Sequence, residues 1–152
     1  MSSIVLVDTS VLLNVLDVPG RNQDRAAVFA TLVAHVEQND HLLLPMAAIV
    51  ETGNHIAHVR DGNERRSAAQ RFVDEIRKAL QGDTPWRPVN FPTNEQVLKW
   101  LHDFPDRASA GIGFGDLSII KEWETCCTRF PMSRVKIWAL DEHLGGFDRV
   151  VP

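Results

Sequence analysis

The sequence has no apolar run that approaches the roughly 20 residues a membrane-spanning helix needs. Its longest early apolar stretch, Ile4 to Val7, is interrupted at once by Asp8, and no basic segment precedes it. We therefore expect neither a membrane anchor nor a secretory signal peptide, and we predict a soluble, cytoplasmic protein.

Cysteine is scarce, and the only two residues, Cys126 and Cys127, are adjacent. Neighbouring cysteines rarely bridge each other, because their α-carbons lie closer together than a disulfide requires. They also lack the C-x-x-C spacing of zinc and redox sites. Two free thiols on a helix are the expected outcome, which suits a reducing cytoplasm.

The chain has no excess of basic residues, since 16 Lys and Arg against 20 Asp and Glu give a net charge of −4. This balance argues against a passive nucleic-acid binder, which needs a positive surface. It argues less against a nuclease with a cluster of carboxylates, because bound cations then supply the positive charge that meets the phosphate.

Short apolar runs alternate with helical patterns along the 152 residues, with no repeat and no low-complexity segment. This alternation predicts one α/β domain, residues 1–152, with a mainly parallel sheet. Predicted strands cover residues 4–7, 41–44, a short segment near Val89, 135–140 and 148–151. Predicted helices begin after Asp8 and after Asn22 or Asp24, cover 46–59, 64–81 and 116–128, and begin after Thr93, whereas 105–115 is a predicted loop. The apolar residues expected to face inward on these helices include Val33, Val36, Phe72, Val73, Ile76, Leu80, Leu98 and Leu101.

Four acids occupy positions where a parallel α/β sheet binds ligands. Asp8 and Asp141 directly follow predicted buried strands, and Glu51 and Asp116 lie near helix starts. Ligands bind outside the carboxyl ends of such strands. Because several carboxylates held close together repel one another, they favour a divalent cation such as Mg²⁺, which prefers oxygen ligands. Each acid also has an ordinary explanation as a helix cap, a solvated helix residue or a turn residue.

Four segments in order resemble the motifs of PIN-domain nucleases, which include the toxins of bacterial toxin–antitoxin pairs. Residues 5–13 (VLVDTSVLL) resemble the opening strand and loop, and residues 45–51 (PMAAIVE) resemble the helix that presents a glutamate. Residues 114–120 (FGDLSII) resemble the third motif, and residues 137–144 (IWALDEHL) resemble the fourth. The resemblance spans nearly the whole chain.

The resemblance implies a three-layer α/β/α domain, Mg²⁺ or Mn²⁺ as cofactor and cleavage of RNA. It further implies that the chain is the toxin of a toxin–antitoxin pair, with an antitoxin protein and a second copy of itself as possible partners. The residues expected to hold the metal and carry out catalysis are Asp8, Glu51, Asp116 and Asp141. The residues expected to contact substrate are Thr9, Ser10 and Asn14.

Other interpretations remain open. Glu51, His55 and His58 share one helical face and offer a zinc site, although the H-E-x-x-H arrangement is absent. An Asp-dependent phosphatase would carry a second Asp two residues after Asp8, where Ser10 stands. A PIN-like fold without activity, serving as a binding module, is the non-enzyme alternative.

Basic and aromatic residues offer further contacts to RNA. The helix at 64–81 is rich in Arg, but interleaved acids favour a solvated, salt-bridged face. Tryptophan side chains can stack on bases, although a place in the core is expected for Trp138, which lies within a strand. The four tryptophans are Trp86, Trp100, Trp123 and Trp138.

Overall fold

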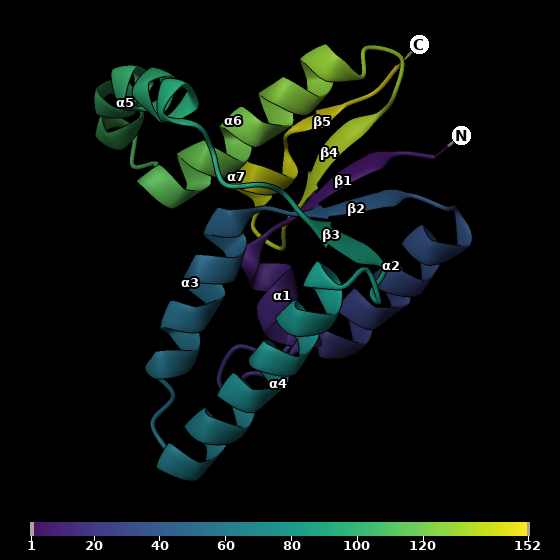
Figure 1. Cartoon of the computed structure of the whole chain (residues 1–152), viewed down its shortest axis with the longest axis vertical. Helices are drawn as coiled ribbons and strands as arrows, with labels where there is room; N and C mark the ends of the chain where they lie inside the picture. Colours follow the sequence, from purple (N-terminus) through teal and green to yellow (C-terminus); the bar gives the residue numbers. More distant parts are fainter. Residues whose placement is uncertain (1, 152) are drawn as a thin grey trace.

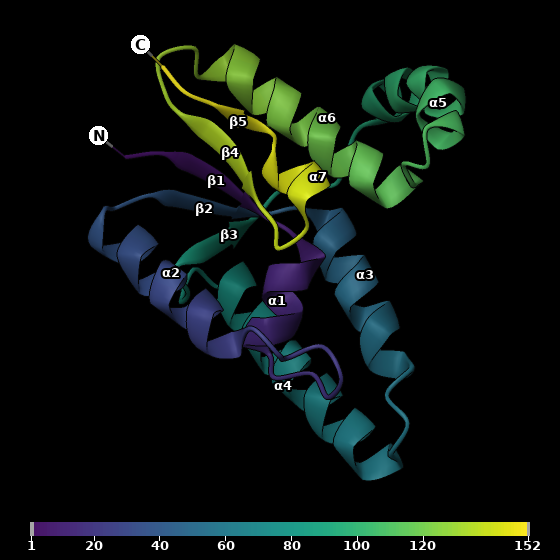
Figure 2. The same cartoon turned by 180° about the vertical axis from the view of Figure 1, so that it is seen from behind.

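A five-stranded sheet with helices on both faces forms the centre of the computed structural model, which describes residues 2–151 (Figure 1, Figure 2). The strands are β1 (Ile4–Val7), β2 (His41–Leu44), β3 (Trp86–Pro88), β4 (Val135–Trp138) and β5 (Asp148–Arg149). The helices are α1 (Thr9–Val15), α2 (Arg25–Glu37), α3 (Met46–Ala57), α4 (Gly62–Leu80), α5 (Asn94–Ser109), α6 (Phe114–Arg129) and α7 (Glu142–Gly145).

The sheet has the order β3-β2-β1-β4-β5, with β1 at its centre. β1 runs parallel to β2 and β4, β2 runs parallel to β3, and only β5 is antiparallel to its neighbour. The predicted α/β class with a mainly parallel sheet is therefore confirmed. Because β1, β2 and β4 run in the same direction, their carboxyl ends share one edge of the sheet.

Alternate side chains of β1 enter two separate cores. Val5 and Val7 pack on the face covered by α1 to α4, whereas Ile4 and Leu6 pack on the face covered by α6 and α7. All four residues of β1 are buried, as expected for a central parallel strand covered on both faces. The helix α5 contacts α6 instead of the sheet (Figure 1).

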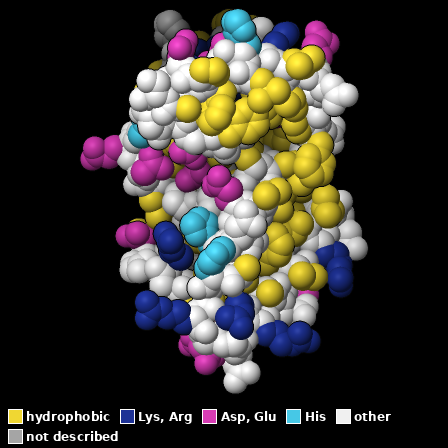
Figure 3. All heavy atoms as spheres, turned by 90° about the vertical axis from the view of Figure 1, so that its left-hand side faces the viewer, with side chains coloured by type: hydrophobic (Ala, Val, Ile, Leu, Met, Phe, Trp, Pro, Cys, Tyr) yellow, Lys and Arg dark blue, Asp and Glu magenta, His cyan; other side chains and the backbone are white. Residues whose placement is uncertain are grey.

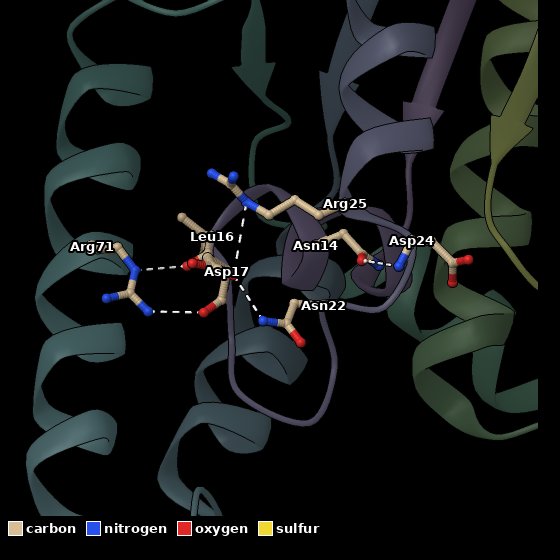
Figure 4. A network of polar contacts seen from close by, with 7 residues as sticks. All are labelled: Asn14, Leu16, Asp17, Asn22, Asp24, Arg25 and Arg71. Carbon is tan, nitrogen blue, oxygen red and sulfur yellow. Dashed lines mark hydrogen bonds and ion pairs between the residues drawn. The ribbon is translucent and has the colours of Figure 1, made fainter.

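Hydrogen bonds connect the carboxyl end of α1 to α4 (Figure 4). The guanidinium of Arg71 donates to the carbonyl oxygens of Leu16 (2.8 Å) and Asp17 (2.9 Å). Asp17 adopts the left-handed conformation with φ 56°, and its carboxylate accepts a hydrogen bond from Asn22. These contacts satisfy carbonyls at the carboxyl end of α1, the helix whose first turn follows Asp8.

The prediction of a loop at residues 105–115 was right only for residues 110–113, because α5 continues through Pro105 to Ser109 and α6 begins at Phe114. A proline inside a helix removes one backbone hydrogen bond and normally ends the helix. Here Phe104 and Trp100 both pack edge-on against Phe114, at ring-centroid distances of 5.1 and 6.4 Å. Both residues precede Pro105, so this aromatic contact packs the part of α5 before the proline against α6.

Several apolar side chains predicted to face inward are exposed. On α4, Phe72 and Ile76 pack against the core, but Val73 lies about 100° further around the helix than Phe72 and points to solvent. The helices rest on the core along a narrow stripe only, so residues beside that stripe remain outside it. The exposed residues are Val33, Val36, Val73, Leu80, Leu98 and Leu101.

Two predicted strands have different ends in the structure. The strand predicted at 135–140 ends at Trp138, and the strand predicted near Val89 covers Trp86–Pro88. The N–H of Val89 still donates to the carbonyl of Leu44, so the segment remains attached to β2. None of the helices within residues 2–151 is both long and apolar enough to cross a membrane.

Candidate functional site

The four predicted acids approach the carboxyl edge of the sheet from four elements. Asp8 follows β1 and caps α1, and Asp141 lies just beyond β4 and caps α7. Glu51 lies in α3, and Asp116 lies in the first turn of α6. Acidic side chains gather in a band on the face that contains the free side of α3 and α5 (Figure 3). The sequence-based expectation that strand ends and helix starts bring these acids to one edge agrees with this placement.

Asp8 is the most enclosed of the four acids, with an exposed fraction of 5%. Its Oδ2 atom accepts hydrogen bonds from the Ser10 backbone N–H (3.2 Å) and from Ser10 Oγ (2.8 Å). The same Ser10 hydroxyl oxygen accepts a hydrogen bond from the N–H of Leu140 (3.1 Å). Ser10 therefore joins the end of β1 to the segment that carries Asp141.

Glu51 is held between Thr9 and Gly115. Thr9 Oγ1 donates to Glu51 Oε2 at 3.3 Å. A Cβ atom at Gly115 would overlap with Glu51 Oε1 and lie 3.0 Å from Glu51 Cδ, whereas a Cβ at Gly113 would meet nothing within 4 Å. The missing side chain at Gly115 thus leaves the space that the Glu51 carboxylate fills. Sequence reasoning treated this glycine only as part of a loop, because the glutamate that it accommodates is distant in the chain.

Asp8, Glu51 and Asp116 have a raised pKa, in part because of neighbouring acids. Burial is the largest cause of the raised pKa of Asp8, Glu51 and Asp116. The charge of Asp8 raises the pKa of Glu51 and of Asp116 further, and the charge of Asp141 raises those of Asp8 and Asp116. Such mutual effects require the four groups to lie near one another.

The negative charge of the four acids is not balanced by an ion pair. Within residues 2–151, no Lys, Arg or His forms an ion pair with Asp8, Glu51, Asp116 or Asp141. His143 lowers the pKa of Asp116, but this is the smallest of the causes acting on that group. The site therefore has the charge and the oxygen donors that suit a hard divalent cation.

The acids are not gathered into a closed set of ligands. In the described part of the chain, no three His, Cys, Asp or Glu side chains form a group that could hold a metal ion between them. Mg²⁺ does not need such a group, because it keeps several of its waters and binds through one or two carboxylates. The space that Gly115 leaves for Glu51 and the set of oxygen donors fit such a water-rich site.

The three residues predicted to contact substrate are all bonded within the protein. Thr9 bonds Glu51 and Ser10 bonds Asp8, as described above. The Asn14 side chain is buried, donates to the carbonyl of Ser10 at 2.9 Å and accepts from the N–H of Asp24 at 3.0 Å (Figure 4). The structure thus places Thr9 and Ser10 among the acids. Asn14 instead binds the backbone of the segment before α2.

His55 lies in the last turn of α3, and His58 is the C-cap residue of that helix. His58 is exposed and its Nδ1 atom contacts the carbonyl of Asn54 at 2.7 Å. Burial lowers the pKa of His55, and the charges of Arg21 and His58 lower it further. A lowered pKa favours the neutral imidazole, which can accept a hydrogen bond.

No protein-family model and no curated protein sequence matches this chain. The function is therefore inferred from the geometry and charge of the site and from the order of its motifs.

Proposed function

We propose that the chain is a metal-dependent endonuclease that hydrolyses RNA phosphodiester bonds. The observation that carries the proposal is the meeting of four carboxylates, without an ion-pair partner, at the carboxyl edge of a parallel sheet. The resemblance of the same four segments to PIN-domain motifs also supports it, because that resemblance rests on the sequence alone.

In this proposal Asp8, Asp116 and Asp141 hold Mg²⁺ or Mn²⁺, directly or through water. When bound, the metal activates a water molecule and neutralises charge on the phosphate. Glu51 orients the attacking water and accepts its proton, a role that suits a carboxylate whose pKa burial has raised. Attack of this water on the phosphorus atom breaks the P–O3′ bond, which leaves a 5′-phosphate on one product and a 3′-oxygen, protonated to the hydroxyl, on the other.

The biological setting is part of the same proposal and rests on the resemblance. A toxin–antitoxin nuclease would act in the cytoplasm, associate with a second copy of itself and be inhibited by an antitoxin protein. Co-purification from the native host, followed by mass spectrometry, tests for such an inhibitor.

The nuclease activity is tested by incubating labelled single-stranded RNA with the protein and Mg²⁺ or Mn²⁺. Asp116→Asn is the informative variant because Asp116 is only half-buried, so its loss does not threaten folding. Asp74→Asn is the matched control, since Asp74 is an exposed carboxylate on α4. We expect Asp116→Asn to slow cleavage by about 10² or more, and we expect EDTA to abolish it and Asp74→Asn to leave it unchanged.

Other outcomes would favour the other functions. Equal cleavage by the wild type and Asp116→Asn would reject the active-site assignment. Metal-independent hydrolysis of a phosphate monoester would favour the phosphatase, and tight RNA binding without turnover, unaffected by Asp116→Asn, would favour the binding module.

A further inference from the structure

An apolar groove with a volume of about 380 Å³ opens beside the acidic site. Its floor contains Trp100 and Phe114, its wall contains Val50, and Phe91 lies at its rim. Glu51 and Gly115 line the groove as well as the acidic site, so the two are continuous. Hydrophobic side chains gather next to the acidic band on this face of the molecule (Figure 3). Its volume lies within the roughly 300–1,000 Å³ of small-ligand sites.

The aromatic side chains of the groove offer a surface for stacking. Phe91 is 70% exposed, an unusual place for a phenylalanine in a protein that buries most of its apolar residues. Trp100 is fixed edge-on against Phe114 and is itself buried, so it forms a rigid floor. Flat aromatic rings of this kind bind nucleobases by stacking.

One carboxylate in the groove has no partner. Glu122 lies on α6 among these apolar residues and is half-buried, and burial raises its pKa. No hydrogen-bond donor and no cation of residues 2–151 contacts its carboxylate, whereas Glu124, two residues further on, pairs with Lys121 at 3.2 Å. A half-buried carboxylate without a donor is costly unless a ligand supplies one.

We propose that this groove binds a guanine base of the RNA next to the cleaved phosphate, with Phe91 stacking on the base and Glu122 accepting its N1–H and N2–H. The inference rests on the proposed nuclease function, because the guanine that it places in the groove is the base directly before or after the cleaved bond. Guanine presents two adjacent donors, which match the two oxygens of a carboxylate. Uracil presents a single N–H between two carbonyl oxygens. A carboxylate repels these oxygens.

A protein segment is the competing occupant, and the composition of the groove favours the base. The groove contains two carboxylates, Glu51 and Glu122, together with the amides of Asn54 and Asn90. An apolar helix docked there would bury these polar groups without partners. A base satisfies Glu122 and leaves its sugar and phosphate directed to the acidic site.

Base binding is measured without metal, in EDTA, so that it does not depend on catalysis. The probes are GMP, IMP and UMP, and the signal is the indole N–H resonance of Trp100 in a ¹H–¹⁵N spectrum, assigned with Trp100→Phe. We expect GMP to shift this resonance and IMP, which lacks the 2-amino group, to bind roughly tenfold more weakly. Equal shifts by all three nucleotides, or no shift, would overturn the proposal.

Two pairs of variants separate the roles of Glu122 and Phe91. Glu122→Gln should abolish the preference for GMP over IMP, whereas Glu124→Gln should preserve it. Phe91→Ala should weaken GMP and IMP alike by about tenfold, whereas Leu98→Ala, at an exposed residue of α5 outside the groove, should have no effect. An unchanged preference in Glu122→Gln would remove the assigned acceptor and reject the proposal.

The failure of this inference is distinguishable from the failure of the nuclease assignment. If Asp116→Asn leaves RNA cleavage unchanged while GMP binding behaves as expected, the nuclease site is wrong and the guanine groove stands. If cleavage behaves as expected but an amphipathic peptide with leucine at every third or fourth position shifts the Trp100 resonance and GMP does not, the groove binds protein and the guanine proposal is wrong.

Discussion

Two aspartates with enclosed side chains lie at opposite edges of the same sheet and differ in how their charge is balanced. Asp40 precedes β2 and accepts hydrogen bonds from the Ser3 N–H (2.7 Å) and His35 Nδ1 (2.7 Å). Burial alone would raise the pKa of Asp40, but these bonds outweigh it and lower the pKa. Asp8 follows β1 and accepts hydrogen bonds from Ser10 and from the backbone N–H of Thr9, which lower its pKa. Burial outweighs these bonds and raises the pKa, and the charge of Asp141 adds to the rise.

The difference shows that burial does not by itself mark a functional acid. Both carboxylates are enclosed, but Asp40 has a histidine of its own chain as a partner, whereas the neighbours of Asp8 include further acids. An acid with an internal partner stabilises the fold. An acid cluster without such a partner favours an external cation, which is the basis of the proposed metal site.

The difference between Asp8 and Asp40 is tested most directly by measuring RNA cleavage for substitutions at the two positions. We expect Asp8→Asn to slow metal-dependent cleavage by roughly 10²–10⁴, because it removes a charge from the site. Asp40→Asn should leave the rate of the folded protein within about twofold of the wild type, since Asp40 lies at the other edge of the sheet. Equal losses in the two variants would show that the loss at Asp8 reflects damage to the fold and not to the site.

We expect the next largest effect on the cleavage rate when the Glu51 carboxylate is displaced. In Gly115→Ala the new methyl group overlaps with the Glu51 carboxylate and displaces it. A displacement of about 1 Å from the productive position lowers the cleavage rate by about 10². Gly113→Ala is the control, because its methyl group meets nothing within 4 Å. A full rate in Gly115→Ala would show that Glu51 has no role in the reaction.

The sequence predicted the placement of the acids because local rules determine it. Asp8 and Asp141 follow apolar strand segments, and Asp8 also caps the next helix, so the carboxyl-edge rule for parallel sheets brought them to the same edge. The start of α5 after Thr93 was predicted for a similar reason, since Thr93 forms a capping box with Gln96 and both partners lie within four residues.

The features that the sequence did not predict depend on contacts between distant residues. The continuation of α5 through Pro105 runs against the local preference of proline, and the packing of Phe104 and Trp100 against Phe114 joins α5 to a different helix. The contact of Gly115 with Glu51 joins residues from two helices. Val73 is exposed because only a narrow stripe of α4 packs against the core, and the width of that stripe depends on the neighbouring elements.

Stability should change in opposite directions at the two aspartates. Asp40→Asn should lower the free energy of unfolding by about 1–3 kcal/mol, because it breaks a charge-assisted contact with a nearly fully buried His35. Asp8→Asn should raise the metal-free stability at neutral pH, because it removes a buried charge whose neighbours are also acidic. Urea denaturation in EDTA measures both, and a loss of stability in Asp8→Asn would mean that its bonds to Ser10 outweigh the repulsion.

Mg²⁺ should stabilise the protein only where the acid cluster is intact. At ten times its dissociation constant, a ligand that binds the folded state alone raises the free energy of unfolding by about 1.4 kcal/mol. We expect this gain in the wild type and in Asp40→Asn but not in Asp8→Asn, with NaCl of equal ionic strength as the control. A gain of the same size in Asp8→Asn would place the bound Mg²⁺ elsewhere.

The smallest effect is a difference in pH dependence between the two variants. The folded pKa of Asp8 lies above its ordinary value of 3.8, so the wild type loses stability as pH rises from that value through the folded pKa. The advantage of Asp8→Asn is therefore complete at neutral pH and disappears as pH falls toward 3.8. The folded pKa of Asp40 lies below 3.8, so the deficit of Asp40→Asn persists to that pH and disappears only below it. Urea denaturation at a series of pH values should show the effect at Asp8 vanishing first; the reverse order would mean that burial at Asp8 is already balanced within the chain, which would leave no need for a cation.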